Sequence, residues 1–326
     1  MVVMRIVVTG ANGFVGRSLV GTLAAQGVEV LALLRRPQGN LGKVQEWLHP
    51  AADFAGLGEA STPFPEGVDV VIHAAARVHV MRESEPGLAQ QAFEASNVDG
   101  ALRVARAARE RGVRRLVFVS SIKALAERDA GQPLDEQMPP HPEDAYGRSK
   151  LLAERRLREY GESSGLEIVI VRPPLVYGPG VRANFESMLR AVARGMPLPL
   201  GAIEARRSLV HVDNLADALA RCALDVRAAG RCFHVADDDP MTIAELLRAI
   251  GRHLDRPARL LPVPVPVLRM IGRLIGRGAQ IDRLTQSLRV STASLAGALD
   301  WRPRLSTEEG LATTAKWYRS TTMSHE

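Results

Sequence analysis

The glycine-rich turn near the start of the chain limits the fold more than any other feature of the sequence. Residues 4–9 are apolar and β-branched, residues 17–26 have helical periodicity, and between them stands Gly10-Ala11-Asn12-Gly13-Phe14-Val15-Gly16. Glycines where a strand turns into a helix allow a tight turn, close packing of the helix on the sheet, and close approach of the backbone to a pyrophosphate. The pattern therefore favours a dinucleotide-binding unit over a purely structural turn.

Four further apolar segments have the length and composition of buried strands, at residues 28–34, 69–76, 114–119 and 166–171. An alanine- and arginine-rich segment at 92–111, which holds Asn97, has amphipathic helical periodicity. The chain then becomes too rich in proline for a central strand, so we expect it to leave the sheet after Pro173. These features predict an α/β protein with a doubly wound, mostly parallel Rossmann sheet and a smaller C-terminal substrate domain.

The end of the second strand indicates which dinucleotide would bind. It reads Arg35-Arg36-Pro37, with no carboxylate to hold the adenosine ribose hydroxyls of NAD(H). An arginine there suits a 2′-phosphate, so the sequence favours NADP(H), with NAD(H) as the alternative and a plain basic loop as the structural interpretation. Asp53, in the poorly patterned residues 44–54, is the candidate for a contact with the adenine edge.

Small residues that close the strand expected at 69–76 fit the same ligand. Ala74, Ala75 and Ala76 would let a dinucleotide lie close to the backbone, whereas His73 before them is interpreted as a packing residue. The strand expected at 114–119 ends in Ser120-Ser121, and the carboxyl ends of parallel strands are where such sheets bind ligands. We therefore expect the Ser121 hydroxyl to meet the substrate.

Tyr146 and Lys150 stand one helical turn apart, so they share a face of the expected helix. A tyrosine with a pKa of roughly 10 can exchange a proton near neutral pH if a nearby ammonium favours its phenolate. The chain has only four lysines, so a lysine at this spacing is notable, although the same spacing also occurs on solvated helix faces. Ser121, Tyr146 and Lys150 are the predicted catalytic residues.

The composition argues against several other classes of protein. Of the 326 residues 46% are hydrophobic and 4% aromatic, and the net charge of +6 comes from arginines dispersed along the chain, which is not typical of nucleic-acid binding. No apolar run reaches the roughly 18 residues of a membrane span, which argues against stable membrane insertion.

Cys222 and Cys232 have no metal-ligand spacing, so no metal is expected. The beginning of the chain lacks signal-peptide features, so we expect a cytoplasmic protein, and a homodimer is an assembly the sequence allows.

Taken together, these motifs resemble the extended short-chain dehydrogenases/reductases of the nucleotide-sugar epimerase/dehydratase family. The resemblance spans nearly the whole chain and rests on residues 9–16, 73–76, Asn97, 120–121, 146–150, 172–174 and 206–217. It implies hydride transfer at a sugar carbon, with Tyr146 as acid/base, Ser121 assisting, and Lys150 on the nicotinamide ribose. It also implies that Asn97 and Pro173 contact the cofactor.

The same resemblance implies a UDP- or dTDP-sugar as the substrate. It places Asn184 on the diphosphate-sugar, Leu200 with Gly201 in the base pocket, and Arg207 on the diphosphate; near the C-terminus only Asp282-Arg283 matches the family's nucleotide contacts. The cofactor domain is expected from residues 1–173 and a return segment at about 208–235. The nucleotide-sugar domain is expected from residues 174–207 and 236–320.

The residues after Ser121 separate the reactions that the family performs. Its sugar dehydratases carry an Asp-Glu pair where this chain has Ile122-Lys123, so dehydration is not expected. The remaining reactions are 4-epimerisation and reduction of a 4-keto sugar, and Arg35 favours the reductase. The sequence at residues 76–81, 120–123 and 172–180 also resembles that of the branch of the family that makes UDP-linked 2-acetamido-2,6-dideoxy sugars for bacterial surface polysaccharide such as O-antigen.

Two hypotheses of another class remain open. A non-catalytic dinucleotide sensor would not need Ser121, Tyr146 and Lys150 together. A membrane-surface protein is suggested by residues 267–284, where apolar residues alternate with arginines. The preferred interpretation of that segment is a substrate-domain helix with a solvated arginine face.

The Arg35→Asp variant tests the cofactor prediction. We expect it to reverse a preference for NADPH over NADH, because the new carboxylate repels the 2′-phosphate and can accept the ribose hydroxyls. Fluorescence titration with both reduced cofactors gives the two dissociation constants. Equal affinity of the natural protein for both cofactors would contradict the prediction.

Overall fold

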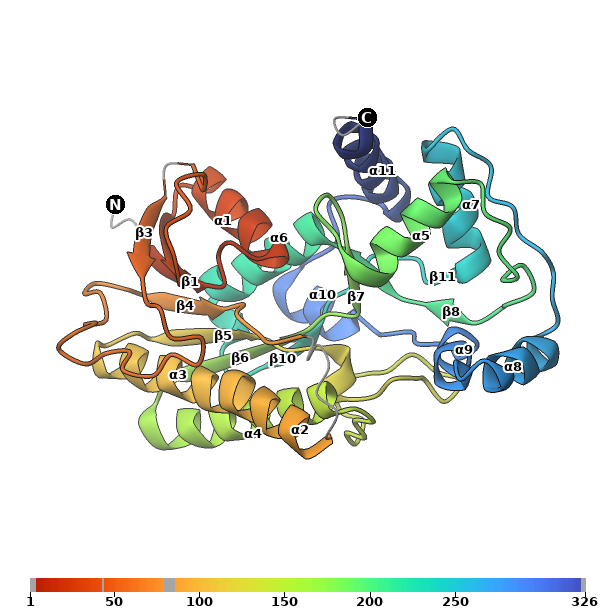
Figure 1. Cartoon of the computed structure of the whole chain (residues 1–326). Coiled ribbons are helices and arrows are strands. Elements are labelled where there is room, and N and C mark those ends of the chain that lie inside the picture. The colour runs from red at the N-terminus through yellow and green to blue at the C-terminus, as the bar shows by residue number, and fades with distance from the viewer. Residues whose placement is uncertain (1–3, 43, 79–85, 324–326) are drawn as a thin grey trace.

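A parallel sheet forms the centre of the protein in a computed structural model, which describes residues 4–42, 44–78 and 86–323 (Figure 1). The order of the seven strands is β10-β6-β5-β4-β1-β2-β3, and all neighbours are parallel. The strands are β1 (Arg5–Thr9), β2 (Glu29–Leu34), β3 (Gln45–Leu48), β4 (Val70–His73), β5 (Arg115–Val119), β6 (Glu167–Arg172) and β10 (Cys232–His234). The predicted doubly wound Rossmann sheet is confirmed.

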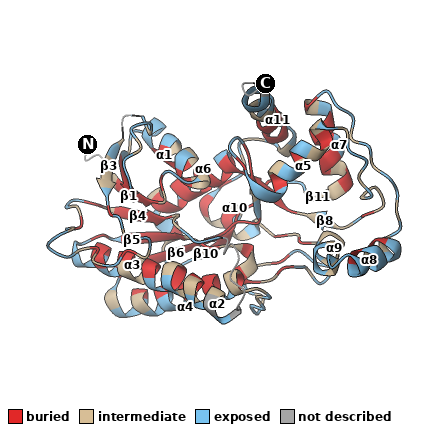
Figure 2. Ribbon diagram, viewed as in Figure 1, coloured by how far each residue is buried: buried red, intermediate tan, exposed pale blue. Residues whose placement is uncertain are grey.

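Helices cover both faces of this sheet. One layer contains α1 (Phe14–Ala25) and α6 (Val212–Leu224), and the other contains α2 (Pro86–Glu94), α3 (Gly100–Glu110) and α4 (Ala145–Ser164) (Figure 1). Successive strand residues point to opposite faces, so Ile6 and Val8 pack toward α1 and α6, while Val7 packs toward α3 and α4. Figure 2 shows the strands buried between these layers, which explains their continuous apolar sequences.

Two local predictions differ from the structure, and one short helix was not predicted. The helix expected at 92–111 begins at Pro86 and contains a π-helical turn, η1 (Ala95–Asp99), which holds Asn97. The segment after Ser121, for which no element was predicted, starts with a short 3₁₀ helix, η2 (Ile122–Ala124). The amphipathic segment at 267–284 is two helices, α8 (Val265–Leu274) and α9 (Gly278–Leu284), because Gly276 reverses the chain with a φ of +70°.

A second group of elements lies beyond one end of the sheet (Figure 1). Strand β7 (Leu175–Tyr177) pairs with β9 (Leu209–His211), β8 (Arg206–Arg207) pairs with β11 (Met241–Thr242), and the helices are α5 (Ala183–Ala193), α7 (Ile243–His253), α8, α9 and α11 (Thr307–Met323). One piece departs from the predicted division, because α10 (Ala293–Leu299) and Trp301 pack into the core beside α1 and α6. A hydrogen bond of 2.8 Å from Trp301 Nε1 to Asp217 on α6 helps to hold this piece there.

The two groups of elements meet at the buried carboxylate of Asp237. It accepts hydrogen bonds from the Tyr177 hydroxyl at 2.8 Å, from Asn214 Nδ2 at 2.8 Å and from the His211 amide at 3.1 Å. One side chain thus joins β7, β9 and α6. In the described residues no helix is both long and apolar enough to cross a bilayer.

Candidate active site

The predicted dinucleotide turn has the geometry that its glycines require. Gly10 has a φ of +67°, and a Cβ there would lie 2.8 Å from the Ala75 Cα. A Cβ on Gly16 would lie 2.1 Å from the Gly10 carbonyl oxygen, so the first turn of α1 packs directly on the strand-to-helix turn. The ends of β1 and β4 are therefore in contact, as a shared ligand site needs.

The N-terminus of α1 has neither a side-chain cap nor an acidic residue that would compete with a bound anion. Its N-cap residue is Gly13, which provides no side-chain cap, and no acidic residue stands in the first turn. In contrast, α4 is capped by Asp144, and α7 by Thr242 with Glu245. Free amide groups and the positive end of the helix dipole favour a phosphate at α1, so this turn fits the pyrophosphate of NAD(P)(H).

The segment after β4 is fixed by short hydrogen bonds. The Thr9 hydroxyl accepts a hydrogen bond from the Ala75 amide at 3.2 Å and lies 3.0 Å from His73 Nδ1. Burial lowers the pKa of His73 to about 3, so its ring is neutral and serves packing, in line with the interpretation from sequence. Ala74 and Ala75 are half-buried beside Gly10, and Ala76 is exposed.

Of the two side chains predicted to contact the adenosine, one is exposed and the other is already bound by an arginine. Arg35 directly follows β2 and is exposed, as a phosphate ligand needs to be. Arg17, which was not predicted, reaches from α1 to the Asn12 carbonyl at 3.1 Å and toward Gln38 beyond β2. The Asp53 carboxylate is bound by Arg103 of α3 at 2.8 Å, so an adenine contact from Asp53 stays a prediction and would have to share that carboxylate.

Tyr146 and Ser121 lie together beyond the end of β5. The Asp144 carboxylate accepts the Gly147 amide at 2.7 Å and so fixes the start of α4, while the Phe93 ring lies 6.0 Å from the Tyr146 ring. Burial raises the pKa of Tyr146 to about 12, and a hydrogen bond with the Ser121 side chain opposes this rise. The sequence predicted a lowered pKa; this was wrong because desolvation of the phenolate outweighs the favourable contacts.

Lys150 is 1% exposed, one turn further along α4. Its ammonium donates a hydrogen bond to the Val119 carbonyl at 2.8 Å and lies 4.5 Å from the centre of the Phe118 ring. Burial lowers the pKa of Lys150 to about 7, although the nearby Glu154 carboxylate raises it. The charged and neutral forms of Lys150 are therefore present in similar amounts near neutral pH.

A buried ion pair that the sequence analysis did not predict lies next to Lys150. The Glu154 carboxylate binds the Arg172 guanidinium through contacts of 2.9 and 2.5 Å and accepts the Ser120 hydroxyl at 2.5 Å. Its i,i+4 spacing from Lys150 was a usable signal, since it places both side chains on one helix face. The pairing with Arg172 could not be foreseen, because those residues belong to different elements.

Asn97 and Pro173 have clear structural contacts. The Asn97 amide bonds both the backbone nitrogen and oxygen of Arg77, at 2.8 and 3.1 Å, and its Nδ2 also lies 3.1 Å from Ser149 Oγ. Asn97 thus ties the segment after β4 to α4, which favours positioning over direct cofactor contact. The Pro173 carbonyl accepts the Ile122 amide at 2.9 Å and so extends the pairing of β5 with β6 beyond the predicted serine.

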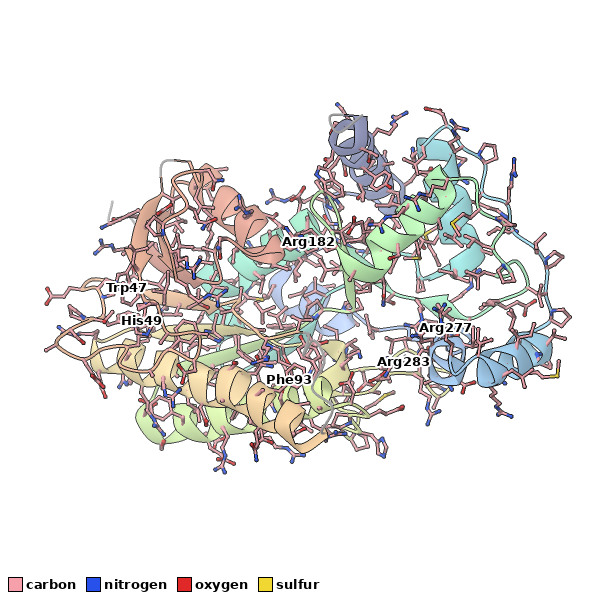
Figure 3. The ribbon with its side chains drawn as sticks, in the orientation of Figure 1. Trp47, His49, Phe93, Arg182, Arg277 and Arg283 are labelled. Carbon is pink, nitrogen blue, oxygen red and sulfur yellow. The ribbon has the colours of Figure 1, made fainter. Side chains whose placement is uncertain are left out.

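The two arginines predicted for the nucleotide are brought together. Arg207 Nη2 donates to the Arg283 carbonyl at 2.5 Å, and Arg283 pairs with Glu127 at 3.2 Å; Figure 3 shows Arg283 on α9. Glu127 also binds Lys123 at 3.3 Å, and Lys123 binds Asp144, the cap of the helix that carries Tyr146, at 2.6 Å. This chain of charges connects the arginines to the start of α4.

Arg207 retains an unused donor. Its Nε is buried without a hydrogen-bond partner among the described residues, and burial lowers its pKa. Asn184 is exposed in the first turn of α5, and Leu200 is half-buried against the core of α5 and α7. No hydrogen bond or ion pair between described residues connects Asn184 to the two arginines, so its predicted role is untested.

The family of the chain follows from comparison with known proteins. The profile of the NAD dependent epimerase/dehydratase family matches residues 6–236. One relative is a UDP-glucose 4-epimerase of Vibrio cholerae, 37% identical over 315 residues, which cover 95% of this chain and 94% of the relative. Another is a GDP-6-deoxy-D-mannose reductase of Pseudomonas aeruginosa, 28% identical over 318 residues and 94% of each chain.

A solved structure gives the same result. The UDP-glucose 4-epimerase of Thermus thermophilus, in complex with NAD, is 26% identical and has a TM-score of 0.76 over 97% of this chain and 99% of that one. The chain belongs to the NAD dependent epimerase/dehydratase family. It is an NAD(P)-dependent enzyme of that family, as the sequence resemblance implied.

The Tyr146→Phe variant tests the proton-transfer residue. We expect turnover to fall by roughly 10²- to 10⁴-fold, because the variant loses the proton donor. Cofactor affinity should change little, since the ring itself remains. Tyr160→Phe, on the same helix, is the matched control, and steady-state kinetics with cofactor titration measure both effects. Near-normal turnover of Tyr146→Phe would remove this role.

The pH dependence of stability tests the burial of Lys150. Its pKa is about 7 in the folded protein but about 10.4 in an unfolded chain, so between these values the unfolded chain binds more protons and stability rises with pH. The Lys150→Met variant buries no ionisable group at this position. We therefore expect its free energy of unfolding to exceed that of the natural protein most at pH 7, and by less and less toward pH 10. Urea unfolding measures the difference, with Lys316→Met as an exposed control. A difference independent of pH would contradict the prediction.

Proposed function

We propose that this protein transfers a hydride at C4 of a UDP-linked hexose, and that it reduces a UDP-4-keto-6-deoxy-N-acetylhexosamine for surface polysaccharide synthesis. The observation that carries the proposal is the contact of Ser121 with Tyr146 beyond the end of β5, with buried Lys150 one turn away. A non-catalytic dinucleotide sensor would have no need of this arrangement.

The protonated state of Tyr146 fits a reduction. With a pKa of about 12 its phenol carries a proton at neutral pH, so it can donate that proton to a C4 oxygen as the carbonyl is reduced. Ser121 would donate a hydrogen bond to the same oxygen, and its own oxygen is oriented by the Lys123 amide at 3.3 Å. Bound NAD(P)H supplies the hydride in this chemistry.

The cofactor would be held by groups already described. The amides at the start of α1 would bind the pyrophosphate, and Lys150 would bind the nicotinamide ribose. Exposed Arg35 would pair with a 2′-phosphate, so we propose NADP(H) as the favoured cofactor and NAD(H) as the alternative.

The substrate diphosphate would lie near Arg207 and Arg283. The buried Arg207 Nε without a partner supports this, because an anionic oxygen would satisfy it. Asn184 and Leu200 are proposed for the sugar-diphosphate and base contacts. A cytoplasmic homodimer stays a prediction.

A second candidate is a UDP-sugar 4-epimerase that acts on UDP-glucose or UDP-N-acetylglucosamine. It is favoured by the 37% identity to the Vibrio cholerae UDP-glucose 4-epimerase. In this reaction the same tyrosine would first accept a proton and then return it.

Two parallel incubations distinguish the candidates. The first contains a UDP-4-keto-6-deoxy-N-acetylhexosamine with NADPH or NADH, and the second contains UDP-glucose or UDP-N-acetylglucosamine without added cofactor. We expect oxidation of reduced cofactor equal to the loss of ketone in the first, and no epimer in the second. An epimer in the second and no cofactor oxidation in the first would contradict the reductase and identify the epimerase.

A further inference from the structure

Helix α8 exposes an apolar stripe to solvent. Val267, Met270, Ile271 and Leu274 are 38, 58, 44 and 80% exposed, and their i, i+3, i+4, i+7 spacing places them on one helix face. Ile275, directly after the helix, adds a fifth side chain at 61%. Such a stripe normally packs into a core, and contiguous exposed apolar surface of this kind marks an interaction site.

The buried face of α8 is different from this stripe. Leu268 and Gly272 are its buried residues, and Gly272 allows close contact with α9, since a Cβ there would lie 2.6 Å from Ile281 Cγ1. The helix is thus already fixed to the protein by one face. The exposed apolar residues are not needed for that packing and remain available to a partner.

The charges on α8 itself are all positive. Residues 256–281 contain no Asp or Glu but have five arginines, at positions 256, 259, 269, 273 and 277. Arg269 pairs with Asp282 of α9 at 3.2 Å, whereas Arg273 and Arg277 are exposed and have no ion-pair partner among the described residues. A partner for this surface must therefore present apolar groups together with negative charge.

The position of α8 makes the surface accessible. It lies at the edge of the molecule, far from the central sheet, with its outer side exposed (Figures 1 and 2). A shallow groove of about 550 Å³ follows its outer side and is lined by Pro266, Arg269, Met270, Arg273 and Leu274. Arginine and apolar side chains thus form one continuous surface.

We propose that α8 docks this protein on the headgroup region of an anionic lipid membrane, with the stripe in the acyl boundary and the arginines among the headgroups. Helices that lie in the interface combine these two features, and they do not need the length of a spanning helix. A second copy of the chain is a poorer partner, because pairing α8 with itself would place the arginines of one copy against those of the other.

Docking by α8 also orients the proposed active site. Helix α9 packs on α8 and carries Arg283, whose carbonyl binds Arg207. A membrane under α8 therefore lies beside the end of the protein that would bind the nucleotide sugar. Docking does not depend on which reaction occurs there, so its test is independent of the two incubations above.

Vesicle sedimentation of the full chain tests the proposal. The vesicles contain either phosphatidylcholine alone or equal parts of phosphatidylcholine and phosphatidylglycerol. We expect binding to the anionic vesicles only, and weakening of this binding at high salt because the arginine contribution is screened. Absence of binding to anionic vesicles, or equal binding to both kinds, would overturn the proposal.

Variants identify the surface responsible. The double variant Met270→Glu/Leu274→Glu should lose vesicle binding, and Arg273→Gln and Arg277→Gln should each weaken it roughly fivefold. Val226→Glu is the matched control, since Val226 is 66% exposed on a different part of the chain and should retain binding. Circular dichroism and cofactor titration verify folding.

Undiminished vesicle binding by the double variant would overturn the proposal. So would light scattering that shows a dimer of the natural protein becoming a monomer in the double variant, without vesicle binding by either. In that case the stripe would belong to an interface between two copies.

Discussion

The burial of one ammonium group determines the arrangement of the site. Lys150 donates a hydrogen bond to the Val119 carbonyl and lies over the Phe118 ring, and the Glu154 carboxylate on the same helix offsets part of the cost of burying its charge. A buried charge is costly unless it is paired and hydrogen-bonded, so these groups must keep their positions. Through Glu154 the constraint extends to Arg172 at the end of β6. The ends of β5, β6 and α4 are thus held together beneath Tyr146.

This arrangement explains how one region can bind a cofactor and transfer a proton. The glycine turn brings the start of α1 to the end of β4, and Asn97 ties the following segment to α4. The pyrophosphate site and the phenol are therefore fixed to the same sheet. On the substrate side, a chain of ion pairs through Glu127 and Lys123 connects Arg283 to the cap of α4.

The sequence predicted those features that depend on neighbouring residues. The strand, turn and helix at residues 4–26 follow from local apolar spacing and glycine, and Tyr146 with Lys150 follows from helical spacing. It could not predict the direction of the Tyr146 pKa, because the direction depends on how deeply the phenol is buried. The packing of Trp301 in the core beside α1 and α6 depends on tertiary contacts, and the break at Gly276 depends on a single backbone angle, so neither was predicted.

Nuclear magnetic resonance of the four lysines can test directly whether Lys150 is a buried ammonium with a pKa near neutrality. Each lysine labelled with ¹³C at Cε gives one signal, and the Lys150→Met variant identifies the relevant one. We expect the Lys150 signal to titrate at about pH 7 in the chain without added cofactor. A Lys150 signal that titrates at roughly pH 10, as a free lysine does, would contradict it.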